Sequence, residues 1–173
     1  MAISLYDVSV RSFLQTVGAA EGFLAKGLEH FTSAGIDPNT VVETSLYPNM
    51  LPFKFQVASI AHHALGAIEG AKAGAYSPSG PPEGVDYAGL QALVREARAG
   101  LEAVSPDEVN ALAGKDVLFQ FGDFKIPFVA EGFLMSFSLP NLHFHATTAY
   151  DILRVQGVPL GKRDYMGALR TKG

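Results

Sequence analysis

The stretch Asp86–Val104, DYAGLQALVREARAGLEAV, carries the clearest fold signal in the chain. Its apolar residues recur at alternating steps of three and four, which is the spacing of a helix packed in a bundle. Asp86 stands where a capping side chain is needed. We therefore expect a helix with one face buried against other helices. The apolar stripe consists of Tyr87, Leu90, Val94, Ala97, Leu101 and Val104.

Three further long helices are expected from the same period, working outward from this stretch. The first runs from about Val10 to a stop at Gly35, the second from Pro52 to about Ala73, and the last from about Ala130 to Gln156. Pairs of a capping residue and a first-turn proline predict two short extra helices. These pairs are Asp37-Pro38 and Ser105-Pro106.

Pro140 lies inside the last long helix. Because proline lacks a backbone donor and its ring clashes with the preceding turn, we expect a kink or a break there. Asn141 would then restart the helix as a cap.

Between the third and the last helix the hydrophobic period changes from helical spacing to alternation. Residues 117–128 alternate around Gly122-Asp123, which predicts a β-hairpin. The Gly-, Pro- and Ser-rich segment Gly74–Gly84 is expected to be a surface loop, and 158–173 an exposed tail with the charged run Lys162-Arg163-Asp164.

These elements predict a mainly α fold, a four-helix bundle with short extra helices and one β-hairpin before the last long helix. We expect a single domain over residues 1–173, because 173 residues suffice for one core and not for two ordinary ones. An α+β sandwich is the weaker alternative, since only two strands are expected.

Composition narrows the function classes. The chain has no cysteine, which excludes disulfides, thiol nucleophiles and thiolate metal sites. A net charge of −4 without a basic cluster argues against nucleic acid, including a helix-turn-helix role, and against anionic membranes. No apolar run approaches a membrane span, and Met1–Val10 does not resemble a signal peptide, so we expect a cytoplasmic protein.

Histidines are the clustered residues that can handle metals or protons. They occur as His62-His63 in the second long helix and as His143 and His145 in the last. Helical spacing places His145 on the apolar stripe and His143 on its flank, and either His62 or His63 can face the last helix. Two facing imidazoles suit Zn, Ni or Fe. They equally suit a core in which each histidine is satisfied by a hydrogen bond, and both readings stay open.

The run 139–154, LPNLHFHATTAYDILR, is followed by Gly157-Val158 and GKRD at 161–164. Together with SLYD at 4–7 and the segment 51–64, it resembles an uncharacterised family of bacterial and fungal proteins, a domain of unknown function. That family is placed in the DinB/YfiT-like superfamily of four-helix-bundle metalloenzymes. The resemblance spans essentially the whole chain and implies the same fold.

The resemblance also implies a site. Superfamily members bind a divalent metal through one histidine of the second helix and two of the last helix, spaced by four. His63 matches the first ligand and His145 the second, whereas Ala149 stands at the third position. Asn141 and Tyr150 are expected as polar neighbours that bind a ligand.

Two hypotheses on function follow. In the first, the protein is metal-dependent, or retains a degenerate metal site, and acts on a small molecule between the second and last helices, with Zn, Ni or Fe as the cofactor. In the second, it is a non-catalytic bundle that binds a small ligand or a protein. Whether it is an enzyme stays open. Superfamily members often pair, and the resemblance implies a homodimer.

Overall fold

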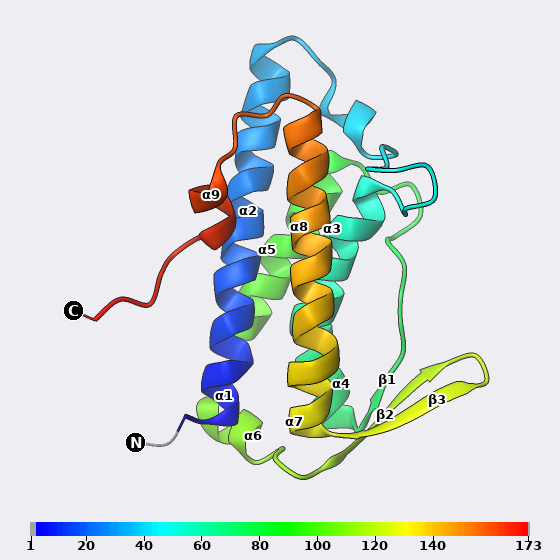
Figure 1. Cartoon of the computed structure of the whole chain (residues 1–173), viewed down its shortest axis with the longest axis vertical. Coiled ribbons are helices and arrows are strands. Elements are labelled where there is room, and N and C mark those ends of the chain that lie inside the picture. Colours follow the sequence, from blue (N-terminus) through cyan, green and yellow to red (C-terminus); the bar gives the residue numbers. More distant parts are fainter. Residues whose placement is uncertain (1–2, 173) are drawn as a thin grey trace.

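In the computed structural model, which describes residues 3–172, four long helical segments lie side by side (Figure 1). The first is α2 (Val10–Ser33), preceded by the single turn α1 (Leu5–Val8). The second combines α3 (Phe53–Ala61) and α4 (Ala67–Ala73). A π-helical turn, His62–Gly66, joins these two without a break.

The third segment is α5 (Tyr87–Ala103), capped as predicted by the Asp86 side chain, which accepts from the Gly89 amide. The fourth combines α7 (Ala130–Gly132), a π-helical segment (Phe133–Ser138) and α8 (Leu139–Val155). The predicted short helices are present as a 3-10 turn (Pro38–Val41) and α6 (Pro106–Asn110).

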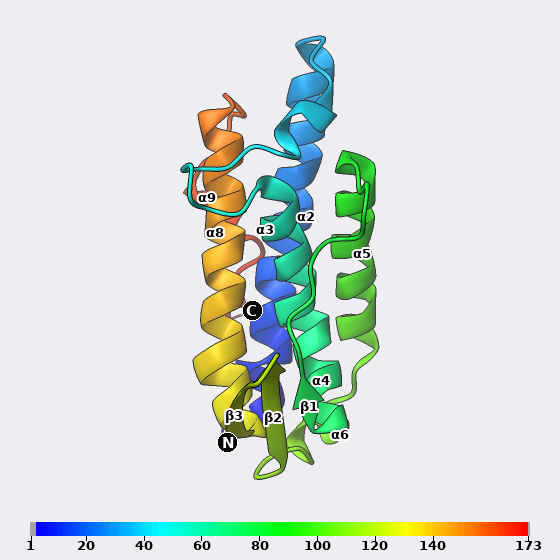
Figure 2. The same ribbon diagram turned by 90° about the vertical axis from the view of Figure 1, so that its right-hand side faces the viewer.

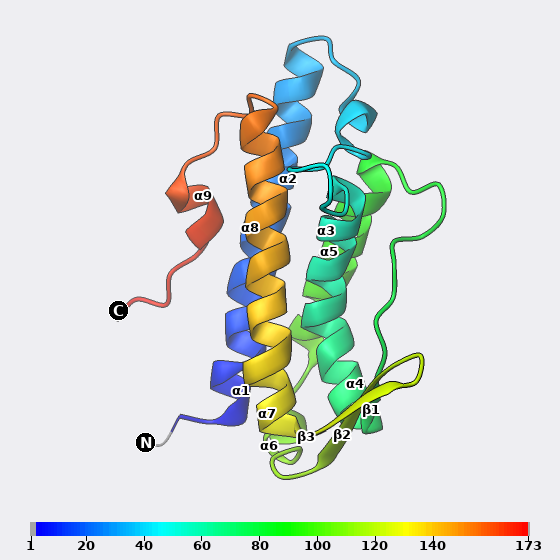
Figure 3. The same cartoon turned by 45° about the vertical axis from the view of Figure 1, so that its right-hand side comes forward.

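The helices enclose one apolar core. α3 packs against both α5 and α8, and α2 also contacts α5 and α8, so α3 and α2 each bridge the same two neighbours (Figures 2 and 3). The predicted stripe of α5 is buried throughout, from Tyr87 to Val104. The prediction of a mainly helical fold is confirmed. No helix between residues 3 and 172 combines the length and apolar character needed to cross a bilayer.

A small sheet lies at the end of the bundle beside α4 (Figure 2). The predicted hairpin is confirmed as β2 (Asp116–Phe121) and β3 (Phe124–Val129), joined by a tight turn in which Gly122 has φ +58°. A third strand, β1 (Ala75–Tyr76), pairs in parallel with β2. The expectation of two strands and of an unbroken loop over 74–84 was therefore wrong. A two-residue strand is too short to show alternation.

Pro140 does not break the last helix. It lies in the first turn of α8, directly after the π-helical segment. In a regular α-helix the proline ring would clash with a carbonyl of the preceding turn. The wider π turn interrupts the regular hydrogen bonding at this place, just before the proline. Asn141 is not a restarting cap, since it lies within α8 and its amide donates to the Phe137 carbonyl at 2.7 Å.

The predicted exposed tail is also corrected. Val158 and Leu160 are buried, and α9 (Lys162–Met166) packs along α2 (Figure 1). The Gln15 amide donates to the Met166 carbonyl, and Lys26 pairs with Asp164 at 2.6 Å. Charge alone suggested solvent exposure, but the apolar residues of this segment anchor it to the bundle.

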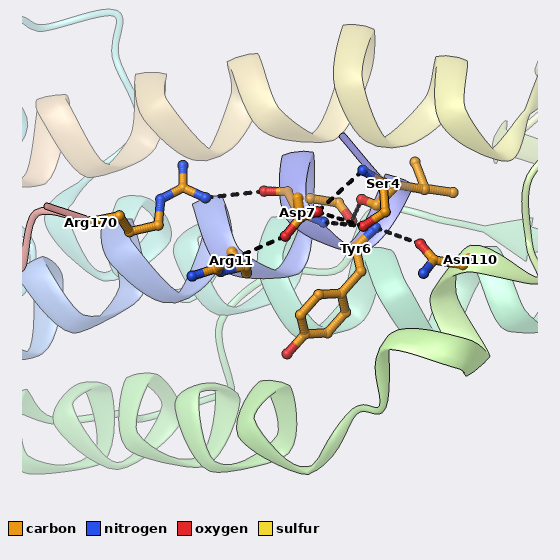
Figure 4. A network of polar contacts seen from close by, with 8 residues as sticks. Ser4, Tyr6, Asp7, Arg11, Asn110 and Arg170 are labelled. Atoms are coloured by element: carbon orange, nitrogen blue, oxygen red, sulfur yellow. Dashed lines mark hydrogen bonds and ion pairs between the residues drawn. The ribbon is translucent and has the colours of Figure 1, made fainter. Parts of the chain in front are cut away.

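A polar network holds the start of α1 (Figure 4). Ser4 and Asp7 form a reciprocal capping box, and the Tyr6 amide donates to Asn110 at the end of α6. Arg170 donates to the Asp7 carbonyl, so the C-terminal segment returns to the first helix. This network accounts for the polar side chains at this end of the bundle without invoking a ligand.

Candidate functional site

His63 and His145 meet between the second and the fourth helical segment. Their ring centroids are 5.5 Å apart and their planes are within 12° of parallel. Each residue is buried, with exposed fractions of 8% and 9%. Of the two histidines in the second segment, His63 is therefore the one that faces the last helix, and His145 points inward as its helical spacing predicts. We refer to these two residues as the histidine pair.

Each of the two helical segments that carry the histidine pair contains a π-helical stretch. His63 lies within the π turn His62–Gly66, and a second π-helical segment, Phe133–Ser138, precedes α8. A π turn holds an additional residue, which changes the direction of the side chains that follow, and such turns are frequent at functional sites. Two of them beside one pair of histidines mark this region as the candidate site.

Each histidine has one nitrogen held by a buried partner. His63 Nδ1 lies 3.1 Å from the Tyr76 hydroxyl, and His145 Nδ1 lies 2.8 Å from Oε1 of Gln56. Neither Nε2 has a hydrogen-bond partner among the described residues, and neither is fully shut off from solvent. The geometry therefore fixes both rings while leaving one nitrogen of each available to a ligand.

Burial keeps both rings uncharged. It lowers the pKa of His63 to about 3, with the nearby His145 and His62 rings adding to the effect. Burial likewise lowers the pKa of His145 to about 4. No carboxylate, lysine or arginine among the described residues contributes to either shift. At neutral pH the pair is a neutral site, able to donate or accept hydrogen bonds or to offer lone pairs.

Aromatic side chains surround the histidine pair. The Phe55 and Phe144 rings contact His145 edge-on, and Phe137 contacts His63 in the same way. Beside Phe144 a surface hollow of about 460 Å³ opens between α8 and the loop before α3. Its lining consists of Leu46, Met50 and Phe144 with the polar residues His143, Thr147, Thr148 and Asp151, so that Phe144 is the residue that connects the hollow with the histidine pair. A largely apolar hollow next to a few fixed polar groups is the usual form of a small-molecule site.

His62 points away from the pair and holds the segment after α4. Its Nε2 lies 3.0 Å from the Ser77 carbonyl, and its Nδ1 lies 3.1 Å from the Ser79 hydroxyl. Its ring stacks on Tyr76 at 4.6 Å. The two adjacent histidines thus both contact Tyr76, His62 by stacking on its ring and His63 through its hydroxyl.

The other predicted residues lie apart from the pair. Tyr150 packs against Phe23 of α2 and Tyr165 of α9. Asn141 is engaged by the Phe137 carbonyl, and His143 is exposed beside Tyr165. The structure thus brings together His63 and His145 and leaves Asn141 and Tyr150 outside their immediate contacts.

Sequence reasoning missed Gln56 and Tyr76. Gln56 is a polar residue on the buried face of the second helix, one turn before Ile60. Glutamine is usually exposed, so its place on this face was a usable signal. Tyr76 had no comparable signal, because it stands in a segment whose Gly, Pro and Ser content indicates a loop.

The metal site implied by the family resemblance is incomplete in this chain. A catalytic zinc normally has three protein ligands. Residues 3–172 contain no group of three His, Cys, Asp or Glu side chains placed to hold an ion, and the buried Ala149 offers no ligand. The donor set amounts to two imidazoles, which does not fit a complete metal centre.

Comparisons with known proteins agree with this fold. The crystal structure of a DinB family member protein from Shewanella denitrificans superposes with a TM-score of 0.80. It is 23% identical, and the match covers 98% of this chain and 95% of that one. No curated protein matches the sequence. The family model described as domain of unknown function DUF1993 matches residues 5–166, and the chain therefore belongs to this family.

Proposed function

We propose that the protein binds a small uncharged molecule at the histidine pair, with the apolar part of the ligand in the hollow beside Phe144. The observation that carries the proposal is the arrangement of the four ring nitrogens. Each Nδ1 is held by a buried partner, and each Nε2 is left for a ligand. The depressed pKa values of both rings favour a neutral ligand, because neither ring offers a charge.

Benzyl alcohol is a suitable first probe, since its ring fits an apolar hollow and its hydroxyl both donates and accepts. We expect it to shift the ring ¹⁵N signals of His63 and His145 in the 173-residue chain and to leave those of His30 unchanged. His145→Leu should weaken binding about tenfold, the effect of losing one ligand hydrogen bond. Binding that is equal in wild type and in the His63→Leu, His145→Leu double variant would contradict the proposal.

A divalent metal is the second candidate, and one contact favours it. Metal-bound histidines usually donate their other ring N–H to an oxygen, as His145 Nδ1 can to Gln56. Elemental analysis of protein purified without an affinity tag or chelator tests it, with a His63→Ala, His145→Ala variant as the control. Near-stoichiometric Zn, Ni or Fe in the wild type alone would establish the metal, and a metal-free protein that still binds benzyl alcohol would support the first candidate.

We also propose that two copies associate through the mixed apolar and polar face beside α1 and α8. Ile3, Met135 and Leu169 are exposed. A hollow of about 830 Å³ is lined by Ile3, Met135 and Leu139 together with the charged Asp7, Arg11 and Arg170. Sedimentation equilibrium of wild type and Met135→Lys tests pairing: a dimer that the lysine dissociates supports it, and a wild-type monomer contradicts it.

The cytoplasmic location of the protein stays a prediction.

A further inference from the structure

The Gln56 side chain determines where His145 carries its proton. Its amide nitrogen donates to the Leu51 carbonyl at 2.7 Å, which leaves the amide oxygen facing His145 Nδ1 at 2.8 Å. The reverse orientation would set the amide oxygen against the Leu51 carbonyl, two acceptors in contact. Because an amide oxygen only accepts, Nδ1 of His145 must donate. In a neutral ring the other nitrogen, Nε2, is then bare.

Tyr76 imposes the opposite arrangement on His63. Its side chain is buried, with an exposed fraction of 4%, and a phenol carries its proton at neutral pH. A buried hydroxyl proton needs an acceptor. Among residues 3–172 the acceptor in reach is His63 Nδ1 at 3.1 Å. With Nδ1 accepting, the neutral His63 ring carries its proton on Nε2.

We infer that the histidine pair presents one N–H donor, at His63 Nε2, beside one bare nitrogen acceptor, at His145 Nε2, and that it selects ligands with a carboxamide group. The inference rests on the proposed binding function and names its ligand class. Tyr76 and Gln56 are positioning residues, since each acts on the ligand only through a histidine.

The chemistry of the carboxamide matches this pair group by group. Its carbonyl oxygen accepts from His63, and its N–H donates to His145. A carboxylate has no proton for the bare nitrogen of His145, and an ammonium has no lone pair for the N–H of His63. A tertiary amide keeps the acceptor but lacks the donor, so it satisfies only half of the pair.

The first measurement reads the protonation of the rings directly. Long-range ¹H–¹⁵N correlation spectra of the 173-residue chain distinguish protonated from bare ring nitrogens. We expect a protonated Nε2 in His63 and a protonated Nδ1 in His145. Tyr76→Phe should convert His63 to a mixture of the two tautomers and leave His145 unchanged, whereas the matched control Tyr87→Phe should change neither. A wild-type His63 protonated on Nδ1 would overturn the inference without any ligand.

The second measurement compares four probes with the same aromatic ring: benzamide, N,N-dimethylbenzamide, benzoate and benzylammonium. Benzamide should bind at least about tenfold more tightly than each of the others, since each leaves one nitrogen unsatisfied. If benzoate or benzylammonium binds the same histidines as tightly, ligand binding stands and the carboxamide selectivity is overturned. If neither these probes nor benzyl alcohol moves either histidine, the proposed function itself fails, and the ring spectra alone decide the polarity of the pair.

Discussion

Tyr76 and Tyr87 are two buried tyrosines in two regions of the molecule. Their exposed fractions are 4% and 1%, and burial raises the pKa of both phenols. Tyr87 is the buried first residue of α5, and its hydroxyl donates to the Leu24 carbonyl at 2.9 Å. Tyr76 lies at the sheet end, where its hydroxyl meets His63. The residue type and the burial are alike, and the hydrogen-bond partner is different.

The partner decides what each hydroxyl can do. The Leu24 carbonyl belongs to a helix, so the Tyr87 contact adds stability and transmits nothing further. A neutral imidazole carries one proton on one of its two nitrogens, so the contact at Nδ1 of His63 determines whether Nε2 is protonated. A buried tyrosine on a backbone carbonyl is therefore part of the core, whereas a buried tyrosine on a histidine influences which ring nitrogen carries the proton.

Tyr87→Ala should have the largest effect on stability. The ring stacks on Phe53 and contacts Phe31 edge-on, so its removal opens a cavity in the core. We expect the free energy of unfolding, measured with urea, to fall by about 3–5 kcal/mol. The ring ¹⁵N signals of His63 and His145 should stay in place in the folded variant. Displaced histidine signals would show that the two regions are coupled after all.

The histidine pair should make stability depend on pH. The folded-state pKa values, about 3 and about 4, lie below the ordinary value of 6.5, so the unfolded chain binds more protons between these limits. Stability is then fully present above pH 6.5 and is lost as pH falls toward 4. With both groups contributing, the slope approaches about 2.7 kcal/mol per pH unit, twice the 1.36 kcal/mol of one group.

Urea unfolding at several pH values measures this slope. A His63→Leu, His145→Leu variant should lose most of it between pH 6 and 5, a range above the ordinary pKa values, 3.8 and 4.5, of the carboxylates whose pKa values are lowered in the fold. A smaller slope should remain, because burial also lowers the pKa values of His62 and His143. A variant at His30, outside the cluster, is the matched control. An unchanged slope in the double variant would mean that the pair is not held neutral by burial.

Gly70→Ala should disturb the Tyr76 region specifically. A Cβ at Gly70 would lie 2.9 Å from the Tyr76 ring and 3.1 Å from the Ala75 carbonyl, and the backbone contact cannot relax by a rotamer change. We expect a loss of about 1–3 kcal/mol and displaced His63 signals. Gly22→Ala is the control, because open space surrounds that position and alanine favours the helix. Equal behaviour of the two variants would contradict the close packing of Tyr76.

Helical periodicity was sufficient to predict most of the fold. The stripe of α5, the hairpin and the inward direction of His145 all follow from spacing, because spacing determines which side chains share a face. The two π-helical turns did not follow from it. The extra residue of a π turn rotates the side chains that follow it, and no residue type in the sequence marks where this happens. The continuous passage through Pro140 was therefore not predicted.

The candidate site was predicted only at its centre. The histidines stood out because they cluster in two of the long helices; spacing placed His145 inward, and the family resemblance singled out His63. Tyr76 contacts His63 from a two-residue strand that pairs with β2. The paired segments are about 40 residues apart in the sequence, and no local sequence pattern predicts such a contact. The buried tail was missed for the same reason, since its helix α9 packs on α2, which lies far away in the sequence.

The smallest expected effect is also the sharpest test of the contrast between the two tyrosines. Tyr76→Phe and Tyr87→Phe each remove one hydroxyl and keep the ring, and each should cost about 1 kcal/mol in the free energy of unfolding. When each is combined with His63→Leu, the two substitutions should differ in their effect on the free energy of unfolding. Tyr76→Phe should cost about 1 kcal/mol less in that background, because its partner nitrogen is already gone, whereas Tyr87→Phe should cost the same within about 0.5 kcal/mol. If both double-mutant cycles give zero coupling, the Tyr76 hydroxyl does not act on His63, and the two tyrosines belong to the same structural class.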